Sequence, residues 1–221
     1  MQNEYSKEQA QALDSHTMRD QIIQSDSQIE VHPLAPFVPQ HARVLMLGSF
    51  PPPRARWKME FYYPNLQNDM WRIFGLVFFQ DANHFLDFNN KAFRQAQIEE
   101  FLTAKGIAIF DTAYKIRRLK NNAADQFLEV VEATDMQQLL DRMPACRFIL
   151  TTGDKATDTL LQSMPEGTAK AKIGQFSSCV YAGRELELHR LPSSSRAYPL
   201  ALAKKAQAYQ DFFQHCGLLS A

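Results

Sequence analysis

The sequence predicts an α/β fold with a mainly parallel sheet that is covered by helices on both faces. Two observations carry this prediction. Short continuous apolar runs recur along the chain, and each is typical of a strand buried on both faces. Segments with helical spacing of apolar residues separate these runs, and strands that alternate with helices form parallel sheets.

The length and composition indicate one globular domain. The chain has 221 residues, of which 45% are hydrophobic, and its 24 Lys and Arg balance its 24 Asp and Glu. A chain of this length can bury enough core to be stable as a single domain. We expect that domain over residues 31–221. Residues 1–30 are polar and are predicted to be a tail or a surface helix, the helix covering residues 6–24.

The sequence also narrows the cellular setting. No apolar run approaches the roughly 20 residues that a membrane span needs, and the polar start does not resemble a secretory signal. Cys146, Cys179 and Cys216 fit neither a disulfide framework nor a zinc or iron–sulfur spacing. We therefore expect a cytoplasmic protein with reduced thiols.

Each predicted element follows from its local pattern. Pro33, Pro36 and Pro39 mark an extended entry into the first strand. The predicted strands cover residues 43–48, 106–111, 146–153 and 185–191, with an extra strand over residues 178–181. The predicted helices cover residues 68–79, 90–104, 135–143, 154–162 and 198–216.

The segments that follow the strands are the candidates for function, because the ligand crevice of such a sheet lies beyond the carboxyl ends of its strands. The loop after the first strand has three consecutive prolines at residues 51–53, three cations within residues 54–58, and aromatic residues as far as Trp71. Cations beside aromatic rings grip a phosphate backbone and stack a base. The same composition also suits a stiff surface loop with a solvated basic edge.

The loop after the last predicted strand offers three serines, residues 193–195, and Arg196 just before a helix. A serine at this position can cap the helix. The same arrangement can hold an anion, because a helix N-terminus presents free N–H groups and the positive end of its dipole.

Other patterns in the sequence give little indication of a functional site. Residues 117–125 form a short basic cluster of the kind that is usually solvated, and residues 151–155 lack the glycines of a nucleotide-hydrolysing P-loop. The G-x-S-x-G elbow of many serine hydrolases is absent. Four histidines show no metal-ligand spacing and are interpreted as structural or surface residues: His41, His84, His189 and His215.

Taken in order, these segments resemble the uracil-DNA glycosylase superfamily. A Gly-x-x-Pro loop follows the first strand, here Gly48-Ser49-Phe50-Pro51, and a Pro-Ser loop follows the last, here Pro192-Ser193-Ser194-Ser195. The segment from Tyr62-Tyr63 to Asn68-Asp69-Met70-Trp71 is most similar to the hypoxanthine-DNA (deoxyinosine) glycosylase branch. The resemblance covers roughly residues 33–217.

The resemblance implies a three-layer α/β/α sandwich around a four-stranded, mainly parallel sheet. It also implies a DNA glycosylase of base excision repair, whose partner is DNA containing hypoxanthine, uracil or xanthine. Such an enzyme flips the deaminated base out of the DNA and hydrolyses its N-glycosidic bond. No metal, cofactor or iron–sulfur cluster is implied.

The resemblance further assigns the site. Phe50 or Tyr62 would stack on the base, and other branches place a water-positioning Asp or Asn where this chain has Phe50. The catalytic residue would therefore be Asn68, whose amide can orient a water and stabilise a cationic sugar. The base pocket would consist of Gly48, Ser49, Phe50, Tyr62 and Tyr63. The residues that press on the DNA backbone and fill the gap left by the flipped nucleotide would be Pro51, Pro52, Pro192, Ser193, Ser194, Ser195 and Arg196.

Two alternatives remain open at this point. The first is a non-catalytic relative that binds nucleic acid or a nucleotide in the same crevice, an interpretation favoured by Phe50. The second is a flavodoxin-like or other doubly wound domain that binds a small phosphorylated ligand.

The zero net charge predicts weak non-specific binding to DNA. The cations nevertheless gather within residues 54–58, 117–120 and 196–205, at or near the carboxyl ends of predicted strands. A balanced total is therefore compatible with one positive face.

Overall fold

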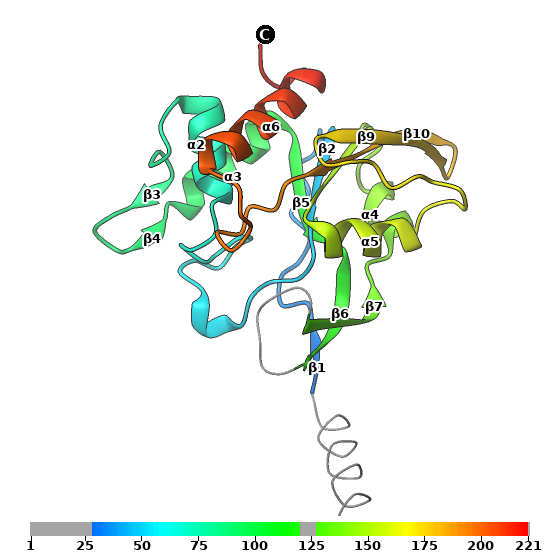
Figure 1. The fold of residues 1–221 in the computed structure, drawn as a ribbon, viewed down its shortest axis with the longest axis horizontal. Helices are drawn as coiled ribbons and strands as arrows, with labels where there is room; N and C mark the ends of the chain where they lie inside the picture. The colour runs from blue at the N-terminus through cyan, green and yellow to red at the C-terminus, as the bar shows by residue number, and fades with distance from the viewer. Residues whose placement is uncertain (1–27, 120–126, 221) are drawn as a thin grey trace, which may run out of the picture.

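The computed structural model describes residues 28–119 and 127–220 (Figure 1). The helix predicted over residues 6–24 lies outside the described residues, as does the part of the basic cluster from Lys120 to Asp125.

The central sheet is mixed and has five strands in the order β5-β2-β8-β10-β9. The strands β2 (Val44–Gly48), β5 (Ile107–Asp111), β8 (Phe148–Thr152) and β10 (Arg184–Leu191) are parallel, and all four were predicted. Every residue of β2 and β5 is buried, as their apolar runs require.

The expectation of a four-stranded sheet is wrong, because β9 (Gln175–Tyr181) joins the edge in antiparallel pairing with β10. Ala182 and Gly183 both have positive φ angles, of 49° and 77°. Two such residues form the tight turn whose twist matches a β-hairpin. The extra strand predicted over residues 178–181 ends where expected but begins three residues earlier, at Gln175.

Five α-helices among the described residues accompany this sheet, and a short 3-10 helix, η1 (Arg54–Arg56), lies in the loop after β2. In Figure 1, α2 (Met70–Phe79), α3 (Gln95–Lys105) and α6 (Leu202–His215) gather on one side of β2 and β5, and α4 (Met136–Asp141) and α5 (Asp154–Gln162) on the other. The helix α2 packs on α6, with the rings of Phe74 and Phe213 centred 5.3 Å apart. The helix α3 begins later than predicted because residues 92–93 form a small hairpin, β3 (Leu86–Asp87) with β4 (Ala92–Phe93).

A second, antiparallel sheet has the order β1-β6-β7 and was not predicted. Its strands are β1 (Ile29–Val31), β6 (Ala113–Arg118) and β7 (Leu128–Ala133). Charged pairs link the two longer strands, with Lys115 2.6 Å from Glu132 and Arg117 2.8 Å from Glu129. Two of the cations assigned to a solvated basic cluster, Arg117 and Arg118, therefore lie in a strand and have acidic partners.

The aromatic-rich composition is used mainly in the core. Trp71, Phe74, Phe85 and Phe213 are among the largest fully buried side chains. Within the described residues, no helix has both the length and the apolar character to cross a membrane.

Candidate active site

A cleft of about 670 Å³ lies at the carboxyl ends of the parallel strands. The loops after β2, β8 and β10 all contribute to its walls, together with the segment from Tyr62 to Asn68. Eleven of the thirteen site residues predicted from the sequence line it: Gly48, Ser49, Phe50, Pro51, Pro52, Tyr62, Tyr63, Asn68, Ser193, Ser194 and Ser195. The other two, Pro192 and Arg196, are not part of the lining.

Two of these segments are joined directly. Asn68 forms an isolated antiparallel bridge with Ser195, and the backbone N–H of Asp69 donates to the carbonyl of Ser194 at 2.8 Å. The two lips of the cleft, one from the loop before α2 and one from the serine loop after β10, therefore form a single hydrogen-bonded unit.

The amide of Asn68 has a fixed orientation. Its Oδ1 accepts the backbone N–H of Met70 at 2.9 Å. A backbone N–H can only donate, so the amide atom that faces it must be the oxygen. The Nδ2 group donates to none of the described residues, and the second lone pair of Oδ1 is also free for a ligand. Asn65, three residues earlier, makes the same contact with the residue two positions ahead: its Oδ1 accepts the backbone N–H of Gln67 at 2.9 Å.

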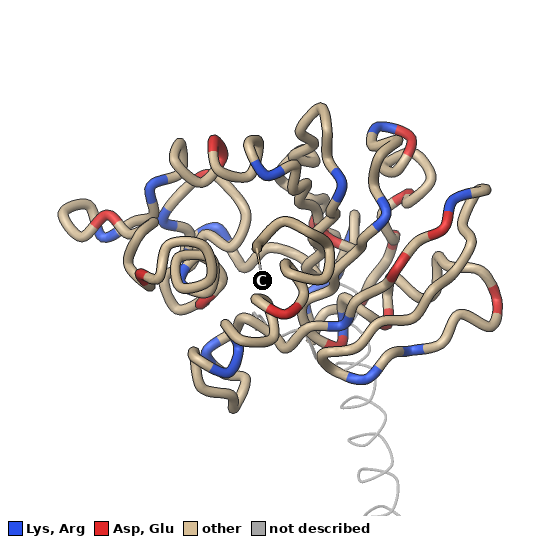
Figure 2. Tube along the Cα trace, turned by 90° about the horizontal axis from the view of Figure 1, so that it is seen from above, with Lys and Arg blue, Asp and Glu red and all other residues tan. Residues whose placement is uncertain are grey.

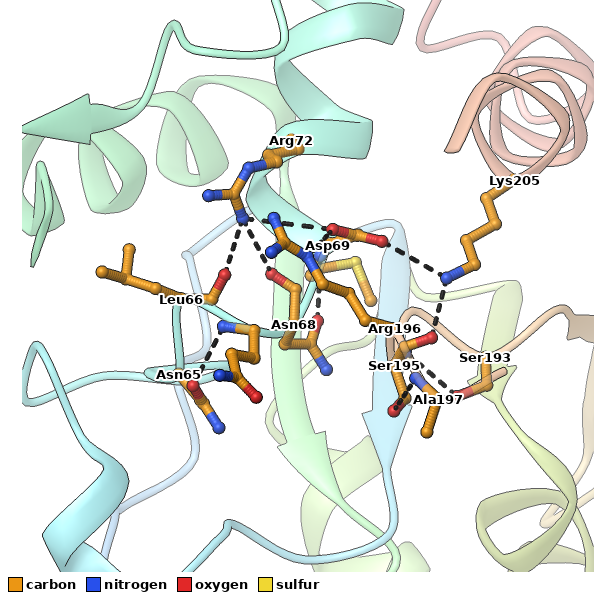
Figure 3. Close-up of polar contacts among 12 residues, drawn as sticks. Asn65, Leu66, Asn68, Asp69, Arg72, Ser193, Ser195, Arg196, Ala197 and Lys205 are labelled. Carbon is orange, nitrogen blue, oxygen red and sulfur yellow. Dashed lines mark hydrogen bonds and ion pairs between the residues drawn. The ribbon is translucent and has the colours of Figure 1, made fainter. Parts of the chain in front are cut away.

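Beneath the lips, one buried carboxylate gathers three cations (Figure 3). Asp69 accepts a hydrogen bond from Nε of Arg196 at 2.8 Å and another from Nζ of Lys205 at 3.3 Å. Nη1 of Arg72 lies 4.0 Å from Oδ1 of the same carboxylate. Lys205 is almost wholly buried, with 1% of its side chain exposed, and it also donates to the carbonyl of Ser195 at 2.7 Å. The serine loop is thus bound to the start of α2 through buried charges as well as through its backbone.

This network limits what Arg196 can do. The guanidinium was expected to contact DNA phosphates, yet its Nε is bonded to Asp69 and its side chain is 49% exposed. Arg196 therefore has part of its charge balanced inside the protein.

The floor of the cleft contains a carboxylate that the sequence reasoning did not select. Asp111 ends β5, is 5% exposed, and lines the cleft. Its Oδ2 lies 3.0 Å from Nε2 of His32, whose side chain is fully buried. An ionised carboxylate only accepts hydrogen bonds, so it makes this contact with a protonated Nε2. The other ring nitrogen, Nδ1, lies 2.9 Å from the carbonyl oxygen of Leu34. A single histidine before a proline forms no motif, so the sequence does not single out His32.

Gly48 allows this carboxylate to approach the backbone of β2. A Cβ atom at residue 48 would lie 2.4 Å from Oδ1 of Asp111 and 3.2 Å from the hydroxyl of Tyr63. No real Cβ makes a contact as short as the first, so any side chain here must displace Asp111. The Tyr63 hydroxyl also lies 3.2 Å from Oγ1 of Thr152, at the end of β8.

The two aromatic rings predicted to stack on a base are already held within the protein. The edge of Phe50 packs against His32, with ring centres 5.3 Å apart, and the Arg118 guanidinium lies 5.5 Å from its centre. Tyr62 is 3% exposed, and its hydroxyl donates to the carbonyl of Ala35. Burial, together with the nearby Asp111 carboxylate, raises the pKa of Tyr62 well above its ordinary value.

Charges of both signs surround the cleft. Arg56 and Lys155 line it together with Asp111, Asp154 and Asp158. In Figure 2 the cations and acids are interspersed along the trace instead of separating into two faces. The positive face expected from the three basic segments is therefore much weaker than the sequence indicated, because several of their cations have acidic partners.

The comparisons with known proteins bear on the fold. No protein-family model matches this chain, and no curated protein matches it. Among solved structures it is similar to the solution NMR structure of a "putative Uracil DNA glycosylase" from Methanosarcina acetivorans, with a TM-score of 0.56 and 21% sequence identity. The two chains share a fold. The similarity covers 86% of this chain and 99% of the other.

Proposed function

We propose that this protein is a DNA glycosylase that removes a deaminated base from DNA. The observation that carries the proposal is the convergence of three separate segments, the Gly48–Pro52 loop, the Tyr62–Asn68 segment and the serine loop, on one cleft. The shared fold with a chain described as a "putative Uracil DNA glycosylase" agrees with it. The helices on both sides of the sheet support the three-layer α/β/α sandwich of that superfamily. We propose the expected single domain over residues 31–221, with Ile29 and Glu30 of β1 added at its start.

The cleft suits a flipped nucleotide. Its volume of about 670 Å³ lies within the range of roughly 300–1,000 Å³ typical of small-molecule sites. A glycosylase must extrude its target base from the stack, at a cost of a few kcal/mol, and receive it in such a pocket. The stiff prolines on one rim and the serine loop on the other are suited to press on the DNA backbone on either side of the extruded nucleotide.

The polar groups of the cleft favour a particular edge of the base. The Asp111 carboxylate accepts hydrogen bonds, and the free Nδ2 of Asn68 donates one. Hypoxanthine, uracil and xanthine each present a carbonyl oxygen next to a ring N–H, which is the complementary pattern. Guanine and thymine present it too, so the pattern separates hypoxanthine and uracil from adenine and cytosine, the bases whose deamination produces them. Adenine and cytosine present an amino group next to an unprotonated ring nitrogen, and this pattern would leave the buried carboxylate facing a lone pair. Removal of hypoxanthine, the substrate of the branch that the sequence resembles, is the most specific form of the proposal.

The proposed reaction is hydrolysis with a cationic sugar in the transition state. As the bond between C1′ and the base nitrogen breaks, its electron pair leaves with the base and positive charge develops on the sugar. The carboxylate of Asp111 stabilises positive charge at close range, because a buried charge is screened less by water than an exposed one. Asn68 orients a water through Oδ1 and Nδ2, and that water adds to C1′ and loses a proton to solvent.

The first test compares two asparagines of the same segment. We expect the Asn68→Ala variant no longer to release hypoxanthine or uracil from oligonucleotides. The reason is that the variant lacks the amide that the N–H of Met70 holds in place. The matched control is Asn65→Ala, which removes the same kind of turn from the same wall of the cleft and should retain most of the activity. Base release is measured by alkaline cleavage of the abasic product under single-turnover conditions. Equal activity of Asn68→Ala and wild type would remove Asn68 from the mechanism.

A second candidate function is binding without catalysis. It is favoured by Phe50, a buried ring at the position where related branches carry a water-positioning amide or carboxylate. It predicts that the wild-type protein binds lesion-containing DNA more tightly than undamaged DNA and never produces an abasic site. A panel of oligonucleotides with hypoxanthine, uracil or xanthine, measured for both binding and cleavage, separates the two functions.

A further inference from the structure

A second cluster of polar side chains lies at the opposite end of the sheet from the cleft. Glu187 and His189 lie two residues apart on β10, so their side chains share one face of the strand. Glu187 pairs with Phe148, the first residue of β8, whereas the cleft begins at the last residue of that strand. His215, the final residue of α6, completes the cluster.

The three side chains converge on one point. A single oxygen, Oε2 of Glu187, lies 3.0 Å from Nε2 of His189 and 2.6 Å from Nε2 of His215. All three potential ligand atoms lie within 4.8 Å of one another. Both imidazoles therefore direct the same ring nitrogen toward the same carboxylate oxygen, from two different elements of the fold.

Two histidines and one glutamate form a donor set suited to Zn²⁺. With bonds of about 2.0–2.1 Å in tetrahedral geometry, ligand atoms lie about 3.3 Å apart. To reach that separation, the contact of His189 with Oε2 must lengthen by about 0.3 Å and that of His215 by about 0.7 Å. The two Nε2 atoms, which lie within 4.8 Å of each other, must approach to about the same separation. Each neutral imidazole can carry its proton on Nδ1 instead of Nε2, which frees both Nε2 lone pairs without loss of a proton from the protein.

The cluster of Glu187, His189 and His215 is covered by aromatic rings on one side and open to solvent on the other, so an ion could enter from the open side. His189 is 6% exposed and is covered by Phe176, whose ring stacks on it at 4.8 Å, and by the edge of Phe212. The side chains of Glu187 and His215 are 29% and 41% exposed, which provides an entry path. An apolar shell around a set of ligands limits competition from water.

We propose that Glu187, His189 and His215 bind one Zn²⁺ ion, with water in the fourth position. The ion cross-links β10 to the end of α6 and so stabilises the folded protein. The site is independent of the cleft and of the function proposed for it. It also departs from the expectation of a metal-free protein, which followed from the family resemblance and agreed with the spacing of histidines along the sequence. Glu187 and His215 are 28 residues apart, so no local spacing reveals the set.

The test is a Zn²⁺ titration of the full chain by calorimetry, after removal of metals with EDTA and dialysis. We expect the wild type to bind one ion at this site, and His215→Gln and Glu187→Gln to lose that binding. Glutamine at residue 215 can still donate a hydrogen bond to Glu187, so the fold should be retained. His41→Gln, which removes an exposed histidine elsewhere, is the matched control and should bind like the wild type.

Two further measurements need no variant. Co²⁺ in place of Zn²⁺ should produce the visible absorption of a tetrahedral ion, and Zn²⁺ should raise the melting temperature of the wild type. Unchanged binding in both cluster variants, or no saturable binding to the wild type, overturns the proposal. So does anomalous diffraction from zinc-soaked crystals that places the ion elsewhere.

Discussion

Gly48 determines how close Asp111 comes to the main chain of the first strand. Because an added Cβ would lie 2.4 Å from Oδ1 of Asp111, Gly48→Ala should push that carboxylate out of place. The backbone at residue 48 has no positive φ angle, so alanine brings a steric conflict and no conformational one. A displacement of about 1 Å in an active site can reduce the rate by the order of 100-fold. We expect a loss of that size in base release by Gly48→Ala.

Circular dichroism and single-turnover assays together test this prediction. The double variant Gly48→Ala/Asp111→Ala removes the atom with which the new methyl group collides. It should recover stability lost by the single variant and remain inactive. Full activity of the double variant would show that Asp111 has no part in the reaction.

The residues that carry the site differ in how visible they are in a sequence. Asn68 and the serines belong to motifs of fixed spacing, and the cleft contains them. Asp111 was only one of several polar residues at the end of a strand, and its importance depends on burial beside Gly48. His32 becomes relevant only through a contact across 79 residues, which no local pattern contains.

At the scale of elements, α6 is connected to the cleft through Lys205. Its ammonium group, buried beside Asp69 and the carbonyl of Ser195, holds the serine loop against the start of α2. Removal of one partner from a buried ion pair typically costs about 3–5 kcal/mol. Since Asp69 keeps Arg196 and Arg72 nearby, we expect Lys205→Met to lower the free energy of unfolding by about 3 kcal/mol, at the lower end of that range.

The control for this prediction is the neighbouring lysine. Lys204 is exposed, and Lys204→Met should change the free energy of unfolding by no more than about 0.5 kcal/mol. Urea denaturation monitored by tryptophan fluorescence measures both variants. Equal stabilities for the two would mean that the buried ammonium contributes nothing to holding the serine loop.

The elements themselves were predictable to different degrees. The buried parallel strands and most helices follow from continuous apolar runs and helical spacing, which are local properties. The sheet of β1, β6 and β7 was missed because its strands are partly exposed and mix charged with apolar residues, so none of them forms a continuous apolar run. The fifth strand of the central sheet was underestimated because its residues alternate between exposed and half-buried, which is a weak hydrophobic signal.

At the scale of the whole molecule, the balanced charge restricts how the protein binds DNA. Each phosphate contact contributes about 0.9 to the slope of log affinity against log salt concentration. Arg56 lines the cleft and has no acidic partner among the described residues, so Arg56→Ala should reduce the magnitude of that slope by about 0.9. Arg196→Ala should reduce it by less, because Asp69 already balances part of the Arg196 charge.

Fluorescence anisotropy with a labelled duplex over a range of salt concentrations measures these slopes. Lys91→Ala, an exposed cation on the turn of the β3–β4 hairpin, is the control and should leave the slope unchanged. A larger effect of Arg196→Ala than of Arg56→Ala would show that Arg196 leaves Asp69 to contact the phosphates.

The contact between Asp69 and Lys205 has a consequence for biosynthesis. The two residues are 136 positions apart in the chain. Their contact holds together the two lips of the cleft, at Asn68 and Ser195, which come from segments almost as far apart. A nascent chain cannot assemble the cleft until the residues of α6 have left the ribosome. Protein that lacks α6 should therefore be unable to excise bases, and the activity should appear only after α6 has been synthesised.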